Sequence, residues 1–363
     1  MRVKLSDITK YSKGSQINGE ELLETGEFIY LNGGINPSGR WSSSNVSGNT
    51  VTISEGGNSS GYVNYVKDPF WCGAHCYYLY DGPRNAKYLY YALKSQQDRL
   101  FGIRSGACMP NIKKSDLGKF EFEFDTNEQR QNAVVTVLSK VELAISYRKT
   151  ELCLLDELIK ARFVEMFENN DYPTSTLMDV IKEGAGLSYG IIVPGEDFNG
   201  GIPMLRPSDF KNGKLDLSQL YRVDPEIEKK YSRTRLIGDE ILVQVIGQPG
   251  QVMLSTPNCR GMNVTRNLAV IRPDDKKINR FYLKHYIELE KSQQKLLQST
   301  KQSTLKQLPL NLLKQLDIEV PPMNQQNQFA SFVEQVDKSK VAVQKSLDET
   351  QLLFDSLMQK YFG

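Results

Sequence analysis

One stretch of the sequence, from Glu128 to Phe167, constrains the fold more than any other. It contains neither proline nor glycine, and apolar side chains recur in it at alternating steps of four and three residues. A spacing of this kind, kept over many turns, is typical of the seam of a coiled coil. At 1.5 Å per residue the predicted helix is about 60 Å long. Its seam consists of Val134, Leu138, Val141, Ile145, Leu152, Leu155, Ile159 and Met166, with Arg148 and Arg162 in two polar positions.

A second stretch, from Gln325 to the C-terminus, carries a seam with the same rhythm. Its apolar members are Val333, Val336, Val343, Leu347, Phe354, Leu357 and Tyr361, and its polar members are Lys340 and Thr350. A long apolar seam must be covered by a partner. We therefore expect the two helices to pair with each other.

Similar phrases recur along the chain in the same order. The two predicted helices both contain a Leu/Phe-Asp-x-Leu phrase near their end, and its aspartates, Asp156 and Asp355, are 199 positions apart. In the same way, Gly238–Val243 echoes Gly48–Ile53, and each of these phrases precedes a glycine-rich turn. We interpret the chain as a tandem duplication, in which a globular segment followed by a long helix occurs twice.

The globular segments have the pattern of an α+β fold with antiparallel or mixed sheets. Short apolar runs separated by polar, glycine-rich turns predict strands, and the stretch Asn85–Arg99 has helical periodicity. Strand and helix do not alternate as a doubly wound sheet requires. The predicted strands of the first segment are Val3–Ile8, Phe28–Leu31, Thr50–Ile53, Tyr62–Val66, Cys76–Tyr80 and Lys119–Phe124.

Composition narrows the class of protein. No run of about 18 apolar residues exists, so we expect no membrane span. The first residues lack the apolar core of a signal peptide, and we therefore expect a cytoplasmic protein. The 45 Lys and Arg residues nearly balance the 43 Asp and Glu residues. A nucleic-acid binder with this balance must gather its basic residues on one face.

The five cysteines are too few and odd in number for a disulfide framework. Cys72, His75 and Cys76 invite a metal interpretation, but no second ligand cluster accompanies them, and we interpret them as residues of an aromatic-rich strand. We therefore predict no metal site.

Signatures of catalysis are missing from the sequence. It has no phosphate-binding loop with a Gly-Lys-Ser/Thr ending, no GxGxxG fingerprint and no GxSxG elbow. The two histidines, His75 and His285, fall in different copies, and we interpret His285 as a helix-surface or core residue. We therefore predict no catalytic residue and no cofactor bound by this chain.

Polar loops next to glycines carry the side chains that contact phosphates and base edges in DNA. In the first segment these candidates are Lys13, Ser15, Asn32, Ser38, Arg40, Asn58, Ser59, Arg104 and Asn111. In the second segment they are Ser188, Tyr189, Arg206, Ser208, Arg233, Arg235, Gln248, Asn263, Arg266, Lys301 and Gln302. A solvated loop residue is the simpler interpretation of any one of them, so the hypothesis rests on the set.

The sequence resembles the specificity (S) subunit of type I restriction–modification systems along essentially its whole length. The resemblance lies in Leu187–Ile191, Gly201–Pro203 with Leu205 and Arg206, the strand after Gly238, Pro321-Pro322 with Gln326, and the helix ending Leu158–Phe163. It implies two target recognition domains, residues 1–124 and 169–322, followed by spacer helices at 125–168 and 323–363. The helices would pair as an antiparallel coiled coil with pseudo-two-fold symmetry.

The resemblance also implies a function. Each domain would recognise one half of a bipartite, asymmetric sequence in double-stranded DNA, and the helices would set the gap. Two methyltransferase subunits that bind S-adenosylmethionine would dock on the helices, and restriction subunits using ATP and Mg would join them. The first domain, with about 124 residues, is shorter than the second.

Two other classes of function stay open. A protein-interaction scaffold that binds peptide or polysaccharide is compatible with the near-neutral charge. A stand-alone nuclease or methyltransferase is the third class, and the missing motifs argue against it. Only a DNA-binding protein loses affinity steeply as salt rises, because counterions are released when phosphates are neutralised.

Overall fold

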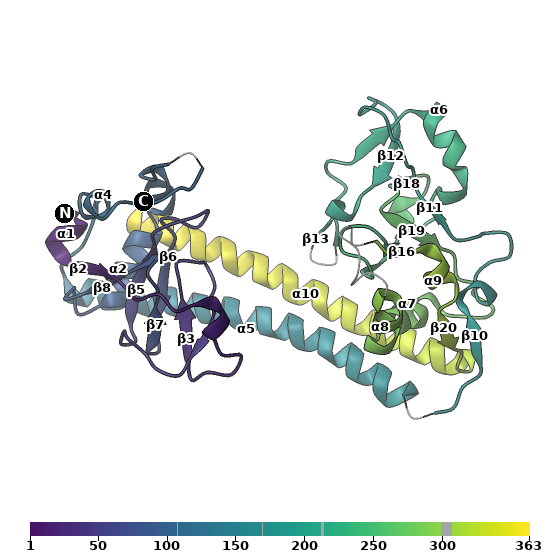
Figure 1. The fold of residues 1–363 in the computed structure, drawn as a ribbon, viewed down its shortest axis with the longest axis horizontal. Coiled ribbons are helices and arrows are strands. Elements are labelled where there is room, and N and C mark those ends of the chain that lie inside the picture. Colours follow the sequence, from purple (N-terminus) through teal and green to yellow (C-terminus); the bar gives the residue numbers. More distant parts are fainter. Residues whose placement is uncertain (107, 169, 212–213, 299–306) are drawn as a thin grey trace. The chain divides into compact units, whose positions relative to one another are not determined.

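The computed structural model describes residues 1–106, 108–168, 170–211, 214–298 and 307–363. These residues form two compact units, each with its own apolar core. Unit 1 comprises Met1–Thr150 and Val343–Gly363, and unit 2 comprises Glu151–Ala342. Two long helices, α5 (Glu128–Phe167) and α10 (Met323–Phe362), contribute residues to both units (Figure 1).

Unit 1 contains a four-stranded antiparallel sheet of order β2-β8-β5-β6, a three-stranded sheet of order β4-β3-β7 and a β1-β9 pair. Strand β5 is buried at every position, and the apolar face of α2 packs on it through Leu89 and Leu93. The elements before α5 are β1 (Arg2–Lys4), α1 (Leu5–Ile8), β2 (Lys10–Lys13), η1 (Gly19–Glu21), β3 (Phe28–Leu31), β4 (Gly39–Trp41), β5 (Thr50–Ser54), β6 (Val63–Val66), β7 (Phe70–Cys72), β8 (Cys76–Tyr80), α2 (Ala86–Lys94), α3 (Gln97–Gly102), α4 (Lys114–Gly118) and β9 (Glu121–Glu123).

Unit 2 contains a four-stranded sheet of order β11-β19-β16-β17, a three-stranded sheet of order β15-β12-β18, a β10-β20 pair and a small β13-β14 hairpin. Its elements between the long helices are β10 (Thr174–Thr176), η2 (Leu177–Asp179), β11 (Ser188–Tyr189), β12 (Ile202–Leu205), η3 (Pro207–Asp209), β13 (Phe210–Lys211), β14 (Lys214–Leu215), β15 (Tyr221–Val223), α6 (Pro225–Glu228), η4 (Lys229–Thr234), β16 (Ile241–Gln244), β17 (Val252–Leu254), η5 (Pro257–Cys259), β18 (Asn263–Val264), β19 (Leu268–Ile271), α7 (Arg280–Glu288), α8 (Glu290–Leu297), α9 (Leu310–Lys314) and β20 (Asp317–Glu319).

The two sets of sheets have the same strand order. Strands β2, β8, β5 and β6 correspond to β11, β19, β16 and β17, and β4, β3 and β7 correspond to β15, β12 and β18. In both three-stranded sheets the central strand is antiparallel to one neighbour and parallel to the other. The predicted duplication and the α+β class with mixed sheets are therefore confirmed. We refer to β1 through β9 as the first copy and to β10 through β20 as the second copy.

The second copy has two insertions that the first copy lacks. The β13-β14 hairpin lies between β12 and β15, and α6 with η4 lies between β15 and β16. In the first copy, residues 42–49 join β4 to β5 without a helix. These insertions account for much of the greater length of the second copy.

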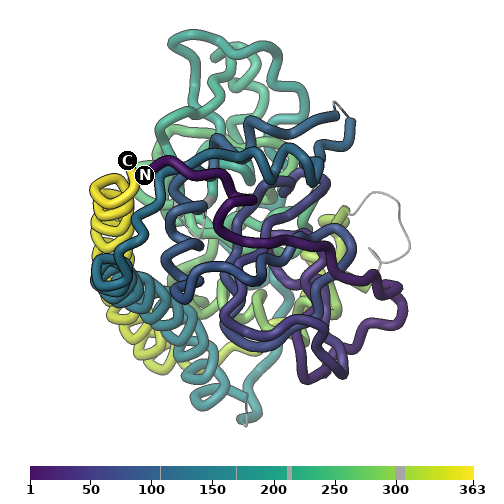
Figure 2. The backbone as a smooth tube through the Cα atoms, turned by 90° about the vertical axis from the view of Figure 1, so that its left-hand side faces the viewer, coloured from purple at the N-terminus to yellow at the C-terminus, as the bar shows by residue number. Residues whose placement is uncertain are grey.

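Helices α5 and α10 pack antiparallel in each unit. In unit 1, Leu138 packs with Phe354 and Met358. In unit 2, the ring of Phe163 lies 5.2 Å from that of Phe329, measured between centroids. Residue numbers thus rise along α5 as they fall along α10, and Figure 2 shows the two helices side by side. Every predicted seam position is buried or half-buried, so the predicted pairing is confirmed.

Polar contacts join the helices at the positions that interrupt the apolar seams. Arg148 Nε donates to Thr350 Oγ1 at 3.3 Å in unit 1, and Lys340 forms an ion pair with Asp156 in unit 2. The other polar seam residue, Arg162, pairs instead with Glu165 of its own helix at 2.7 Å.

Two predicted elements of the first copy were wrong in their extent. The strand predicted at Val3–Ile8 ends at Lys4, because the Asp7 carboxylate accepts the Lys4 N–H and starts helix α1. The helix predicted at Asn85–Arg99 breaks between α2 and α3. There, the Gln97 side chain accepts a hydrogen bond from the Val63 N–H and donates one to the Gly61 carbonyl. These two bonds hold the start of α3 against β6.

Candidate nucleic-acid interface

Three loops of the first copy meet at the end of β5 and the start of β8. Backbone and side-chain hydrogen bonds join them: Gly57 N–H donates to the Pro110 carbonyl at 2.9 Å, and Ser59 Oγ donates to the Gly33 carbonyl at 2.7 Å. Loops that are distant in sequence thereby form one surface. It contains the predicted residues Asn58, Ser59, Arg104 and Asn111.

Within this surface the predicted residues differ in exposure and in the contacts that their side chains make. Arg104 Nε donates to the Ser60 carbonyl at 2.7 Å, and the guanidinium lies 3.9 Å from the centre of the Phe101 ring. Ser105 and Asn111 form a backbone bridge, and Asn58 is exposed. The surface thus has a fixed arginine and an exposed amide beside it.

The remaining predicted residues of the first copy lie near the turn between β7 and β8 or on the mixed sheet. Lys13 forms an ion pair with Glu55, and Asn32 Oδ1 accepts the His75 N–H at 3.2 Å. Ser15 is exposed and its N–H donates to the Cys72 carbonyl. On the mixed sheet, Ser38 is exposed, and the Arg40 guanidinium donates to the carbonyls of Gly26 and Glu27.

Of the predicted residues of the second copy, some are paired within the protein and others are exposed. Arg206 forms an ion pair with Asp209 at 2.8 Å, and Ser208 lies in η3 between them. Gln248 and Arg266 are exposed. Ser188 and Tyr189 form the edge strand β11 and are half-buried. Lys301 and Gln302 lie outside the described residues.

A buried polar network fixes the α6–η4 insertion to β18. The Glu228 carboxylate is 1% exposed and accepts hydrogen bonds from Arg235 Nε and Asn263 Nδ2, both at 2.9 Å. Asn263 is fully buried, and its Oδ1 accepts the Thr234 hydroxyl at 2.7 Å. The hydrogen bond from Arg235 holds the pKa of the Glu228 carboxyl below its ordinary value, against the effect of burial. We therefore propose that Asn263 and Arg235 hold the α6–η4 insertion in place and do not contact bases.

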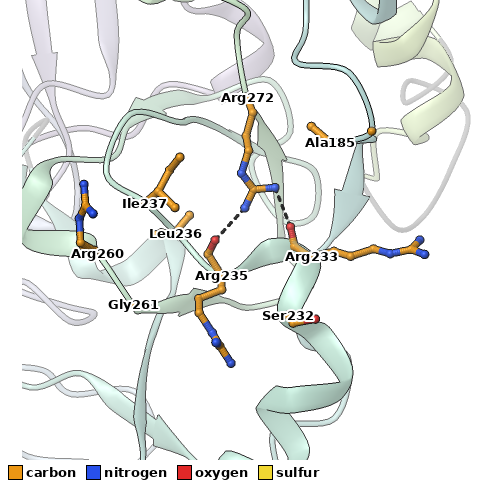
Figure 3. A pocket seen from close by; sticks show the side chains of 10 residues that line it. Ala185, Ser232, Arg233, Arg235, Leu236, Ile237, Arg260, Gly261 and Arg272 are labelled. Atoms are coloured by element: carbon orange, nitrogen blue, oxygen red, sulfur yellow. Dashed lines mark hydrogen bonds between the residues drawn. The ribbon is translucent and has the colours of Figure 1, made fainter.

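A second buried carboxylate organises the adjoining turn. Glu240 is fully buried, and its carboxylate accepts the N–H groups of Ile237 at 2.7 Å and Gly238 at 2.9 Å, and the Ser255 hydroxyl at 2.7 Å. Arg272 Nε lies 3.6 Å from Glu240 Oε1. The same guanidinium donates to the carbonyls of Arg233 and Arg235, both at 2.7 Å (Figure 3).

Sequence patterns did not identify Glu228, Glu240 or Arg272 as members of these buried networks. One signal was present, because the echo that aligns Gly238–Val243 with Gly48–Ile53 places Glu240 where the first copy has Thr50. A glutamate at the start of a buried strand needs a cationic or N–H partner. Its partner Arg272 is remote in sequence, and only the β16-β19 pairing brings the two together.

His285, Cys72 and Cys76 occupy structural positions. His285 packs edge-on against Phe329 and its Nδ1 lies 3.1 Å from Glu288 Oε2, so it is a core histidine of α7. Cys72 and Cys76 are buried where β7 ends and β8 begins. Within the described ranges, no three His, Cys, Asp or Glu side chains are grouped so that they could hold a metal ion.

Residues 1–153 and 170–350 match the family described as the type I restriction modification DNA specificity domain. The chain belongs to this family. Among its relatives, the specificity subunit of the EcoBI type I restriction enzyme of Escherichia coli is 29% identical over 196 residues, which cover 53% of this chain and 41% of the relative. A putative type I specificity subunit of Mycoplasma genitalium is 37% identical over 130 residues, 35% of this chain and 34% of the relative.

Solved structures of type I systems share the fold of this specificity-family chain. The S subunit of the type I restriction–modification system of Mycoplasma genitalium superposes with a TM-score of 0.60 at 21% identity, over the whole of this chain and 96% of that one. A chain from a structural study of complex assembly in the type I system superposes with a TM-score of 0.52 at 16% identity, over 99% and 96% of the chains. Among the residues that the structure describes, no helix is long and apolar enough to cross a membrane.

Proposed function

We propose that this chain is the specificity subunit of a type I restriction–modification complex. In this role each copy recognises one half of a bipartite, asymmetric site in double-stranded DNA, and the chain itself catalyses no reaction. The observation that carries the proposal is the repeated scaffold. The same strand order occurs twice, whereas the loops and insertions around it differ between the copies. A shared scaffold with different loops suits two binders of one kind with different targets.

The long helices are the proposed spacer between the half-sites. Each is 40 residues long, which corresponds to about 60 Å. DNA repeats about every 34–36 Å, so elements of this length suit half-sites that lie roughly one turn apart. The polar contacts Arg148–Thr350 and Lys340–Asp156 oppose slippage of one helix along the other.

One face of α5 is the proposed docking surface for two methyltransferase subunits. Four large apolar side chains, Leu143, Tyr147, Leu154 and Leu158, are 47–65% exposed. Their spacing of four, seven and four residues places them on one side of the helix. They fall on different positions from the seam that packs on α10. Exposed apolar stripes of this kind mark interaction surfaces.

The chemistry in the proposed complex belongs to the partners. The methyltransferase subunits would bind S-adenosylmethionine and methylate adenine, and restriction subunits would use ATP and Mg to cut DNA. Such a complex acts on DNA in the cytoplasm. This chain would supply target recognition and assembly.

A methylation map of the genome tests the proposed function. Cells with the gene, without it and with it restored are compared by sequencing that detects methylated adenine. We expect one bipartite motif to lose methylation on deletion and to regain it on complementation. Identical maps in the three strains would contradict the proposed function, and loss of a continuous motif would contradict the two-half-site arrangement.

A further inference from the structure

One loop of each copy leads into the central strand of the three-stranded mixed sheet. In the first copy it joins β2 to β3 and covers residues 14–27, and in the second copy it joins β11 to β12 and covers residues 190–201. Because β2 and β3 correspond to β11 and β12, the two loops occupy equivalent places on the repeated scaffold. We call them the entry loops.

An arginine on the neighbouring strand holds the entry loop of the first copy. The Leu23 N–H donates to the Arg40 carbonyl at 3.0 Å. The guanidinium of Arg40, which lies on β4, donates in turn to the carbonyls of Gly26 and Glu27. The loop is therefore fixed on both sides of residue 25.

The second copy repeats this clamp with different residues. The Phe198 N–H donates to the Arg222 carbonyl at 3.0 Å, and Arg222 Nη1 donates to the Gly201 carbonyl at 3.1 Å. Arg222 lies on β15, the strand that corresponds to β4. Two loops that differ in length and sequence thus keep one arrangement of hydrogen bonds.

In both copies the clamp holds an apolar side chain at the surface. Leu23 is 43% exposed and Phe198 is 45% exposed, although the backbone of each is fixed. In the second copy the exposed side chains of Ile192 and Val193 belong to the same loop. Apolar side chains that a rigid backbone keeps in water are typical of a binding surface for another protein.

The charge of the entry loops is negative in both copies. Neither range contains a lysine or an arginine. Among the residues that the structure describes, no carboxylate of these loops forms an ion pair. The exposed acidic residues are Glu20, Glu21, Glu24 and Glu27 in the first copy and Glu196 and Asp197 in the second. Such loops repel the phosphates of DNA and attract a basic surface.

We propose that each entry loop binds one methyltransferase subunit, with Leu23 or Phe198 inserted into an apolar pocket that has a basic rim. The proposal rests on the proposed function, because it assumes that two such subunits assemble with this chain. A partner that is present twice needs one equivalent contact on each copy, and the clamped loops provide it. The contact is additional to the exposed face of α5.

Binding of the separately purified methyltransferase subunit to the full chain tests the entry loops. Calorimetric titrations compare the wild type with Leu23→Ser, Phe198→Ser and the double variant. Each single variant should weaken one of the two bound subunits by about tenfold or more, and the double variant should weaken both.

Two matched controls remove apolar side chains of similar exposure from other loops of the same copies. Ile35 is 53% exposed in the first copy, and Ile237 is 43% exposed in the second. Ile35→Ser and Ile237→Ser should bind two subunits as the wild type does. Unchanged unfolding midpoints of all variants would confirm that only the surface differs.

The basic rim is tested by salt. The triple variant Glu20→Gln, Glu24→Gln and Glu27→Gln keeps the size of the side chains and removes three charges. It should weaken one bound subunit at low salt and much less at high salt, because salt screens exposed charges. An equal affinity of the triple variant and the wild type at low salt would overturn the basic rim.

The outcomes separate this inference from the proposed function. If the wild-type chain binds no methyltransferase subunit, the proposed function fails. If it binds two subunits and the loop variants match Ile35→Ser and Ile237→Ser, only the entry-loop contact fails. Loop variants that keep both subunits but lose affinity for DNA, or that change the oligomeric state of the free chain, also overturn it, because the loops would then contact DNA or a second copy of the chain.

Discussion

Six arginines on the second copy fall into two groups by their contacts. Arg206, Arg235 and Arg272 each lie beside a carboxylate, at Asp209, Glu228 and Glu240. Arg233, Arg260 and Arg266 are exposed, and within the described parts of the chain their side chains have no acidic partner. A paired guanidinium must give up its partner before it can bind DNA, whereas a free one need not. We therefore propose that DNA contacts come from the second group.

Arg266 is the residue that we expect to contact a base in the second half-site. It follows β18, and its backbone N–H donates to the Ile191 carbonyl at 2.9 Å, while its side chain has no partner among the residues that the structure describes. If it binds guanine in a bidentate manner, Arg266→Ala should cost about 1–3 kcal/mol with the cognate base and much less with a substituted base. Binding to duplexes that differ at single positions measures this difference.

Arg266→Lys is the matched control for that measurement. Lysine keeps the charge but loses the planar pair of donors. For a base contact, the lysine variant should lose discrimination as the alanine variant does. Full rescue by lysine, with equal losses for all sequences in the alanine variant, would make Arg266 a phosphate contact.

Lys94 gives unit 1 a pH-dependent stability. Its ammonium donates to the Val63 carbonyl at 3.2 Å and to Gln97 Oε1 at 3.1 Å, and burial lowers its pKa to about 8. The unfolded chain keeps the ordinary pKa of about 10.4. Between these values the unfolded state binds a proton that the folded state has lost, so the free energy of unfolding should rise with pH.

Tryptophan fluorescence measures this effect in unit 1 alone, because both tryptophans, Trp41 and Trp71, lie there. Denaturant titrations from about pH 7.5 to about 9.5 should show rising stability in the wild type and not in Lys94→Met. The window ends below pH 10 because burial raises the pKa of Tyr77 to about 12, which reverses the trend at higher pH. Equal pH profiles for the two proteins would refute the role of Lys94.

At the scale of elements, the helix pair should set the gap between the half-sites. Insertion of seven residues after Leu152 in α5 and after Gln344 in α10 keeps the seam rhythm in both helices. Both points lie between the contacts Arg148–Thr350 and Lys340–Asp156, so the two contacts are kept. The insertion lengthens the pair by about 10.5 Å.

A methylation map of the double-insertion strain tests this role. We expect a longer gap between two unchanged half-sites. The α5 insertion alone is the control, and it should abolish methylation because it breaks the match between the seams. Altered half-sites with an unaltered gap would contradict the spacer role.

The outer face of α5 should be needed for assembly and not for folding. Leu154 and Leu158 are 63% and 47% exposed, so Leu154→Gln with Leu158→Gln removes apolar surface at little cost to stability. We expect weaker co-purification of the methyltransferase subunit with an unchanged unfolding midpoint. Cys153→Ser, at an exposed position beside them, is the matched control. Undiminished co-purification of the double variant would move the docking surface elsewhere.

At the scale of the whole molecule, the sequence predicted the repeated architecture because each of its signals is local or periodic. The seams follow a rhythm of three and four residues, and the strand phrases repeat at a nearly constant offset. What it did not predict depends on particular side-chain hydrogen bonds and ion pairs, some between residues close in sequence and some between distant ones. The Asp7 cap that ends β1, the break before Gln97, and the pairing of Arg235 with Glu228 all arise from folded geometry.

The same limit applies to the candidate site. Loop composition marked polar residues of both copies, but it did not distinguish Asn263, which is fully buried, from Arg266, which is exposed. Both are polar side chains close together in one glycine-flanked segment. Their difference arises because Asn263 lies in the buried strand β18 and is bound by the buried Glu228, whereas Arg266 follows that strand.

Because the units have separate cores, their contributions to DNA binding should add. Arg104 belongs to unit 1 and Arg266 to unit 2, and they share no contact partner in the described residues. The cost of Arg104→Ala with Arg266→Ala on binding to the complete target should therefore equal the sum of the single costs within about 0.5 kcal/mol. A coupling of more than about 1 kcal/mol between Arg104 and Arg266 would mean that the long helices transmit the occupancy of one half-site to the other.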